Sequence, residues 1–206
     1  MKATQIRITL GLAAVFGAGV FAVALGLGDQ TAFADAVSPT GAFTASLCSG
    51  TKATFKLGTA TVSCNVSSTT GNATSSASGQ PICDAITAPT LSGCTVNAAG
   101  FSFAATCTTT GTWNLCASSG GTASLTIPQN AVACTARVFG QTCTATSTTA
   151  GSATIAGAWN NTTSSAGFTS QSVPVATSGG FPCPSANAAV FLAQYCTSPA
   201  LAISPN

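Results

Sequence analysis

The stretch TCTTTGTWNLC, Thr106 to Cys116, places two cysteines around a Gly-Thr pair and a tryptophan, with no chargeable side chain among its residues. A two-residue loop at Gly111–Thr112 suits a type II′ turn, which takes glycine at its first position. Cys107 then lies opposite Cys116 at a non-hydrogen-bonded position, where the two Cα atoms are about 4.5 Å apart. A disulfide tolerates that separation. The stretch therefore predicts a β-hairpin closed by a Cys107–Cys116 disulfide.

The chain contains ten cysteines and no histidine. Zinc sites usually combine Cys with His or use close Cys-x-x-Cys pairs. Redox catalysis also favours Cys-x-x-Cys, and a cysteine nucleophile needs a neighbouring base. The sequence has none of these patterns, whereas an even number of cysteines in an exported chain is typical of a disulfide framework. We therefore expect all the cysteines to form disulfides, with no metal ion and no cofactor.

Proximity in the sequence extends this prediction to the other cysteines. CTARVFGQTC, Cys134 to Cys143, repeats the spacing of the first pair and would close a second hairpin around Arg137 to Gly140. The complete nearest-neighbour set is Cys48–Cys64, Cys83–Cys94, Cys107–Cys116, Cys134–Cys143 and Cys183–Cys196.

The N-terminal region has the features of a secretory signal peptide. Two basic residues precede the apolar run Ile8–Gly28, and small residues follow it up to Ala34. This order predicts cleavage after Ala34, with residues 1–34 as the signal peptide and residues 35–206 as a single secreted β domain. The alternative is that the run is retained as a membrane anchor, since its length just spans a bilayer. We expect the mature protein to be secreted, extracellular or at the cell surface, without a membrane segment after cleavage.

Charge is almost absent from the expected mature chain. Its chargeable side chains are Lys52, Lys56, Arg137, Asp35 and Asp84. Binding to nucleic acid or to an anionic membrane relies on clustered Lys and Arg, for which the sequence offers no basis. Weak charge also means weak self-repulsion. The expected partners are therefore other copies of the chain, the extracellular matrix or hydrophobic surfaces.

Short runs rich in Thr, Val, Ala and Phe alternate with Gly, Ser, Asn and Pro about every ten residues, a rhythm typical of an all-β sandwich or barrel. The expected strands are Ala53–Leu57, Thr59–Val66, Gly100–Cys107, Thr112–Ala117, Ala123–Pro128, Ala131–Phe139, Thr142–Thr149, Ala153–Asn161, Ser170–Thr177 and Ala189–Cys196. The fold class that follows is all-β, a disulfide-stapled antiparallel β-sandwich or barrel-like domain.

Two features along the chain have alternative interpretations. SANAAVFLAQY, Ser185 to Tyr195, fits either a short helix or a strand, and the β character of the rest favours the strand. Trp113 and Trp159, the two tryptophans, would serve either as a binding platform or as core residues. A chain with so few large side chains favours the core.

Catalysis has little to draw on in this composition. General acid–base chemistry uses His, Glu, Asp or Lys brought together, and the mature chain offers the carboxylates Asp35 and Asp84 alone. A glycosidase needs two carboxyl groups across a cleft. Lys52 and Lys56 lie among Ser and Thr residues, but lysines in this setting keep a strand edge soluble. We expect no enzyme and assign no catalytic residue.

Several motifs resemble one family of bacterial exported proteins, in the order VSPTGAFTAS, TVSCNVSSTTGNAT, ITAPTLSGC, GTWNL and TIAGAWNN. They are similar to the protein activators of alkane oxidation (PraA/PraB type) and to related secreted actinobacterial proteins. The likeness covers most of Val37 to Asn161. It implies a secreted β-protein linked to growth on hydrocarbon and to the biofilm matrix, and it supplies no catalytic residue. The cysteine content is higher than the family pattern.

Two classes of function follow. The first is a structural or adhesive extracellular protein that acts by apolar surface association or self-assembly, with a link to hydrocarbons. The second is a carrier of a small apolar ligand, resembling in architecture and composition the enediyne-antibiotic apoproteins. A deep apolar pocket would favour the carrier, and a filled core with an exposed apolar patch or open strand edge would favour adhesion.

Overall fold

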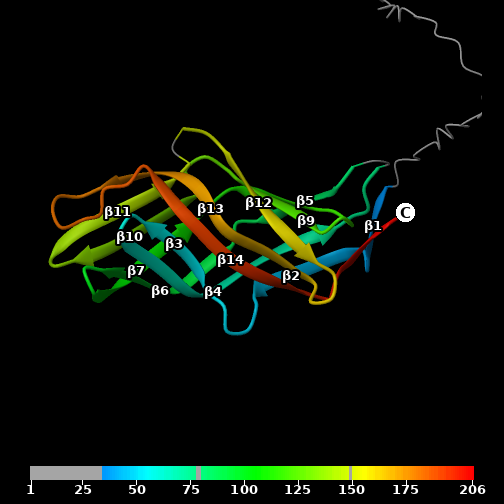
Figure 1. Cartoon of the computed structure of the whole chain (residues 1–206), viewed down its shortest axis with the longest axis horizontal. Coiled ribbons are helices and arrows are strands. Elements are labelled where there is room, and N and C mark those ends of the chain that lie inside the picture. The colour runs from blue at the N-terminus through cyan, green and yellow to red at the C-terminus, as the bar shows by residue number, and fades with distance from the viewer. Residues whose placement is uncertain (1–33, 78–79, 149) are drawn as a thin grey trace, which may run out of the picture. The chain divides into compact units, whose positions relative to one another are not determined.

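The computed structural model describes residues 34–77, 80–148 and 150–206. They fall within one compact unit, Ala32–Asn206 (Figure 1). The expected signal peptide and its alternative, a membrane anchor at Ile8–Gly28, lie outside the described residues. Within the described part of the chain, no helix is long and apolar enough to cross a membrane.

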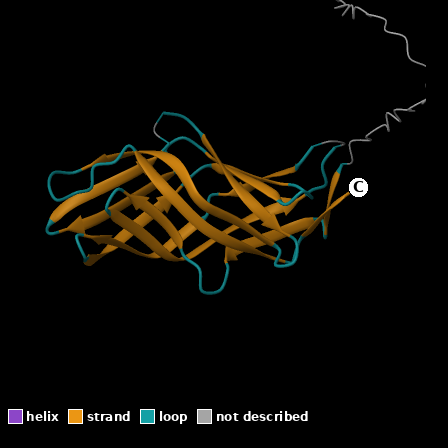
Figure 2. Cartoon of the chain, in the orientation of Figure 1, coloured by secondary structure: helices purple, strands orange, loops and turns teal. Residues whose placement is uncertain are grey.

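The described residues form strands joined by turns and loops (Figure 2). The strands are β1 (Asp35–Ser38), β2 (Gly41–Leu47), β3 (Ala53–Leu57), β4 (Ala60–Ala73), β5 (Ile82–Thr87), β6 (Thr90–Ala98), β7 (Phe101–Thr109), β8 (Thr112–Ala117), β9 (Thr122–Ile127), β10 (Val132–Val138), β11 (Gln141–Ser147), β12 (Ala153–Asn160), β13 (Ser165–Ser178), β14 (Ala188–Ser198) and β15 (Ala202–Pro205). The all-β prediction is confirmed, and every segment expected to be a strand is one. The ambiguous Ser185–Tyr195 stretch contributes strand β14.

Thirteen strands form one antiparallel sheet that closes into two rings of hydrogen-bonded strands. The first ring runs β3–β4–β6–β7–β10–β11–β13–β14 and returns to β3. The second ring runs β2–β4–β5–β8–β9–β12–β13–β14 and returns to β2. The remaining strands, β1 and β15, form a separate two-stranded sheet. Closure gives each ring strand a partner on both sides, so the antiparallel, barrel-like architecture leaves few free edges.

Three long strands, β4, β13 and β14, belong to both rings. Along β4, the first part pairs with β3 and β6 and the last part with β2 and β5. In this last part, Gly71 pairs with Ile86, and a Cβ there would lie 2.7 Å from the Phe43 ring, so the close approach of that side chain requires glycine. On β13, the register shifts between Phe168 and Gln171, where β12 gives way to β11 as a neighbour.

Alternation of buried and exposed residues places the core inside the rings. Phe168, Ile127 and Ile155 are among the largest fully buried side chains. Trp113 and Trp159 are 4% and 6% exposed, as expected of core residues. Two cavities inside the rings measure about 20 and 30 Å³, which is room for one or two water molecules each. Neither is large enough for a small-molecule ligand.

All ten cysteines form disulfides, which confirms the expected framework. The pairs are Cys48–Cys196, Cys64–Cys94, Cys83–Cys116, Cys107–Cys134 and Cys143–Cys183. Three of them join residues directly opposite each other on paired strands, with Cα atoms 4.0 Å apart. This is the short separation of a non-hydrogen-bonded pair.

The expected Cys107–Cys116 hairpin is wrong, because Thr110 and Gly111 carry the chain from one ring to the other. Strand β7 pairs with β6 and β10, whereas β8 pairs with β5 and β9. Cys107 therefore lies opposite Cys134, and Cys116 lies opposite Cys83.

The other expected pairs are also wrong: Cys48–Cys64, Cys83–Cys94, Cys134–Cys143 and Cys183–Cys196. The β10–β11 hairpin does form, but its loop is Phe139–Gly140, so Cys134 lies opposite Ala145. Cys143 lies opposite Ala136, two residues away from the position opposite Cys134, and it bonds Cys183 in the β13–β14 connection. Neighbouring cysteines in the sequence occupy different strand pairs, which is why proximity fails as a guide.

Non-reducing peptide mapping tests this topology directly. We expect the five disulfides of the structure and no free thiol. Replacing Cys107 and Cys134 together by Ala should lower the free energy of unfolding by about 3–4 kcal/mol, because the bond closes a loop with a sequence separation of 27. A peptide that links Cys107 to Cys116 would contradict the two-ring arrangement.

A buried tyrosine makes stability depend on alkaline pH. Tyr195 on β14 is 8% exposed, and its hydroxyl lies 2.7 Å from the Ser67 Oγ on β4. Burial raises the pKa of Tyr195 above its ordinary value of 10.0, although the hydrogen bond with Ser67 opposes that rise. The folded state therefore favours the neutral phenol. The resulting contribution to the free energy of unfolding is fully present below the pKa of the unfolded state and is lost as pH rises through the pKa of the folded state.

We predict that the free energy of unfolding changes little between about pH 5 and about pH 9, because the chain has no His and no Glu. Above about pH 10 it should fall. Tyr195 is the single tyrosine, so tyrosinate absorbance reports its ionisation without interference. The Tyr195→Phe variant should lose this alkaline dependence and about 1 kcal/mol of stability through the lost hydrogen bond. If the free energy of unfolding of the variant still falls above about pH 10, groups other than Tyr195 cause the alkaline dependence.

Candidate functional site: an aromatic tip

Four connections meet at one end of the first ring, the end at the left of Figure 1. Two-residue turns join β3 to β4, β6 to β7, and β10 to β11. The longer segment 179–187 joins β13 to β14. Antiparallel pairing around the ring brings all four to the same level.

Apolar side chains project from these connections into solvent. Phe181 is 97% exposed, Phe101 58% and Phe139 54%. Phe139 packs edge to face against Phe101 and Phe103, with ring centroids 5.3 and 5.0 Å apart. We call Phe101, Phe103, Phe139, Phe181, Pro182 and Pro184 the aromatic tip. Sequence reasoning missed this cluster, because its members come from three separate connections.

Phe139 occupies a turn position that does not suit a phenylalanine. Phe139 and Gly140 have φ values of 48° and 87°, and paired positive φ values are typical of a type I′ hairpin turn. Asn-Gly is the preferred sequence there, and a bulky side chain with positive φ is strained. Phe139 therefore adds strain to this turn while about half of its side chain stays exposed to solvent.

The segment that carries Phe181 is held in place on both sides. Cys183 is bonded to Cys143 on β11, and its backbone N–H donates to the Gly180 carbonyl over 2.9 Å. Further along, the Ala186 N–H donates to the Thr177 Oγ1 over 3.1 Å. Phe181 is consequently presented to solvent by an anchored loop, which reduces the entropy lost on binding.

An open apolar hollow of about 820 Å³ lies between these connections. Ala60, Ala98 and Val138 form its buried floor, and residues of the aromatic tip form its wall. None of its lining residues is charged. The hollow is the outer mouth of the first ring, and the packed core closes it from beneath.

Among the described residues, two basic side chains lie near the aromatic tip and both carboxylates lie in the other half of the molecule, while Lys52 belongs to the β2–β3 connection. Lys56 on β3 and Arg137 on β10 are exposed, and each lies two residues before a turn at the aromatic tip. The two carboxylates belong to β1 and β5 in the other half. The Asp84 Oδ1 accepts a hydrogen bond from the Thr74 hydroxyl at 2.6 Å, and the Asp35 Oδ2 accepts one from the Ser119 N–H at 3.2 Å. Both carboxylates therefore hold loops in place.

Of the two lysines considered for chemistry, Lys56 lies on β3 and Lys52 in the β2–β3 connection, while the carboxylates of the described residues lie on β1 and β5. Lys52 lines a second surface hollow, of about 590 Å³, over β12, β13 and β14. The Gln171 amide in this hollow is already engaged, with its Oε1 accepting from the Ala156 N–H and its Nε2 donating to the Thr169 carbonyl. The hollow offers no grouping for acid–base chemistry.

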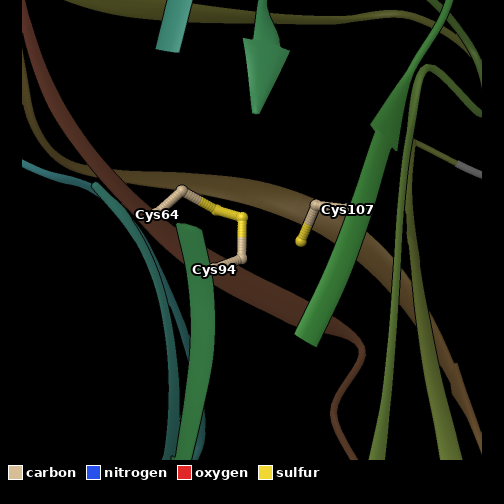
Figure 3. Close-up of side chains that lie close together, drawn as sticks. All are labelled: Cys64, Cys94 and Cys107. Atoms are coloured by element: carbon tan, nitrogen blue, oxygen red, sulfur yellow. A yellow bond between two sulfur atoms is a disulfide. The ribbon is translucent and has the colours of Figure 1, made fainter. Parts of the chain in front are cut away.

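Three cysteine sulfur atoms lie as close together as the ligands of a metal ion, but each of them already forms a disulfide. The Sγ atoms of Cys64, Cys94 and Cys107 lie within 4.8 Å of one another (Figure 3). Cys64 is bonded to Cys94, and Cys107 to Cys134, so two disulfides lie side by side on adjacent strands. Metal binding requires thiolates, and these sulfurs act as staples of the core.

Comparison with protein-family models, with curated proteins and with solved structures finds no match for this chain. The site is therefore defined by its own geometry. It is a preorganised group of exposed aromatic and proline side chains around an apolar hollow, with a cation on either side.

Variants of Phe139 test the strain in its turn. Phe139→Ala and Phe139→Asn both remove the aromatic contacts, but Asn tolerates positive φ better than Ala. We predict that the Asn variant is more stable than the Ala variant by about 1 kcal/mol in denaturant unfolding. Equal stabilities would show that Phe139 does not occupy a left-handed turn position.

Proposed function

We propose that the protein is a secreted adhesive protein of the extracellular matrix or cell surface, and that it binds apolar surfaces through the aromatic tip without turnover. Five disulfides support export, because such bonds persist in oxidising compartments. The observation that carries the proposal is the 97% exposure of Phe181 beside the exposed Phe101 and Phe139. Exposed apolar clusters on a soluble protein mark interaction sites.

The closed rings favour association through side chains of the aromatic tip over pairing of strand edges between molecules. Strand-edge pairing between molecules needs unpaired backbone groups, and the ring strands have neighbours on both sides. The aromatic tip therefore serves as the contact surface in this account. Hydrocarbon is an apolar surface of the required kind, in agreement with the resemblance to protein activators of alkane oxidation.

A carrier of a small apolar ligand is the second candidate. The hollow at the aromatic tip, about 820 Å³, is within the size range of ligand pockets. The small size of the interior cavities weighs against it, because a carrier buries most of its ligand. A ligand in this hollow would remain open to solvent on one side.

Binding of the purified mature protein to hexadecane droplets tests the proposal. Phe181→Ser should weaken binding at least about tenfold, because burying one Phe side chain contributes about 1.5–3 kcal/mol. Phe139→Asn should also weaken it. The matched control is Val66→Ser, which removes an apolar side chain, 54% exposed, from a strand face outside the tip. Binding by the parent protein should change little with salt, because screening acts on charges.

Two results would contradict the proposal. Equal loss of binding in the control would show that the whole surface contributes rather than the tip. A protein that ignores droplets but takes up one small apolar molecule per chain would be a carrier.

A further inference from the structure

We propose that the aromatic tip inserts into the interface of a lipid layer with anionic headgroups, with Lys56 and Arg137 contacting those headgroups. This inference rests on the proposed function and names the surface that the tip is built for. Its basis is the position of the two basic residues relative to the exposed phenylalanines.

The two cations lie on opposite sides of the tip. In the first ring, β3 and β10 are separated by four steps in either direction, so Lys56 and Arg137 face away from each other across the ring. Both side chains are exposed. A flat surface that meets the tip end-on therefore lies near both cations at once.

The depth of the cations matches the thickness of a headgroup layer. Lys56 precedes the turn residue Gly58 by two positions, and Arg137 precedes Phe139 by two. At about 3.3 Å per residue, each cation begins roughly 7 Å behind the turns. Interfacial segments bury their apolar side chains about 5–10 Å into the boundary between headgroups and acyl chains. Inserted phenylalanines would then leave both cations at the level of the headgroups.

The carboxylates lie where they do not oppose this contact. Gly71 pairs with Ile86, which places Asp84 beyond the level of Gly71 and more than ten residues of β4 from the tip. That length corresponds to roughly 35 Å or more of strand, several times the Debye length of about 8 Å at physiological ionic strength. Asp35 belongs to the small β1–β15 sheet, outside the first ring. An anionic surface at the tip is therefore attracted by Lys56 and Arg137, while the carboxylates of Asp35 and Asp84 are too far away to repel it.

Lys56 and Arg137 lie far apart in the sequence, so they do not form the cluster of basic residues from which membrane binding is normally predicted. Two cations contribute little unless apolar insertion brings them to the surface. Once they are there, each adds about fivefold to the partition onto an anionic layer. The combination is what distinguishes this surface from neutral hydrocarbon, which the phenylalanines alone would bind.

Vesicle co-sedimentation of the full mature protein tests the inference. The probes are vesicles of phosphatidylcholine alone and of phosphatidylcholine with phosphatidylglycerol. We expect at least tenfold tighter binding to the anionic vesicles at physiological ionic strength. Lys56→Gln and Arg137→Gln should each weaken that binding about fivefold and leave hexadecane binding unchanged. The matched control is Lys52→Gln, which removes the same charge from the β2–β3 connection and should have no effect.

The outcomes separate the inference from the proposed function. Binding to hexadecane without preference for anionic vesicles would overturn the inference and leave the proposed function standing. An equal effect of Lys52→Gln would also overturn it, because net charge and not position would then matter. Binding to neither surface would overturn both. Circular dichroism of each variant checks the fold, which substitutions at exposed positions should preserve.

Discussion

Closure of the hydrogen-bond ladder around β4, β13 and β14 is the constraint on which the rest of the structure depends. Each of these strands changes partners part of the way along its length, so one sheet closes twice and encloses two stretches of core. A chain of small residues such as Ala, Ser, Thr and Gly buries little apolar area per residue. Satisfying backbone groups on both sides of each strand and adding covalent bonds across neighbouring strands compensates for that limited core.

The disulfides follow from this closure rather than from the order of cysteines in the chain. Cys64–Cys94, Cys83–Cys116 and Cys107–Cys134 each join residues that strand register places directly opposite each other. The even cysteine count and the strand rhythm predicted the fold class and the bonding of every cysteine. The pairing was beyond reach, because it depends on the crossing at Thr110–Gly111, where an apparent hairpin turn is a connection between rings. Strands β1, β2, β5, β6 and β15 were also missed. Strands β1 and β15 are only four residues long, and the Ser, Thr, Ala and Gly residues of β2 and β6 carry little hydrophobic contrast.

In the candidate site, too, the sequence reveals local features of the turns but not which distant residues the fold brings together. Phe139 is recognisable in the sequence as a poor turn residue, and its positive φ shows that the turn forms nonetheless. What the sequence does not reveal is that Phe101 and Phe181 share its end of the molecule, because ring closure alone brings them together. Three of the four large apolar side chains that are exposed among the described residues lie at this end, while the disulfides and the buried core stabilise the strands behind it. The division fits a rigid body that presents one adhesive surface.

Contact through the tip is the central claim, and tryptophan fluorescence tests it most directly. Trp113 and Trp159 are buried on β8 and β12, strands that belong to the second ring alone. A Phe181→Trp variant adds an indole at the aromatic tip. With droplets of a brominated alkane, the account predicts that the added emission is quenched on binding while the emission of the parent protein is unchanged. Quenching of the native tryptophans, or an unquenched tip in a variant that still binds, would contradict it.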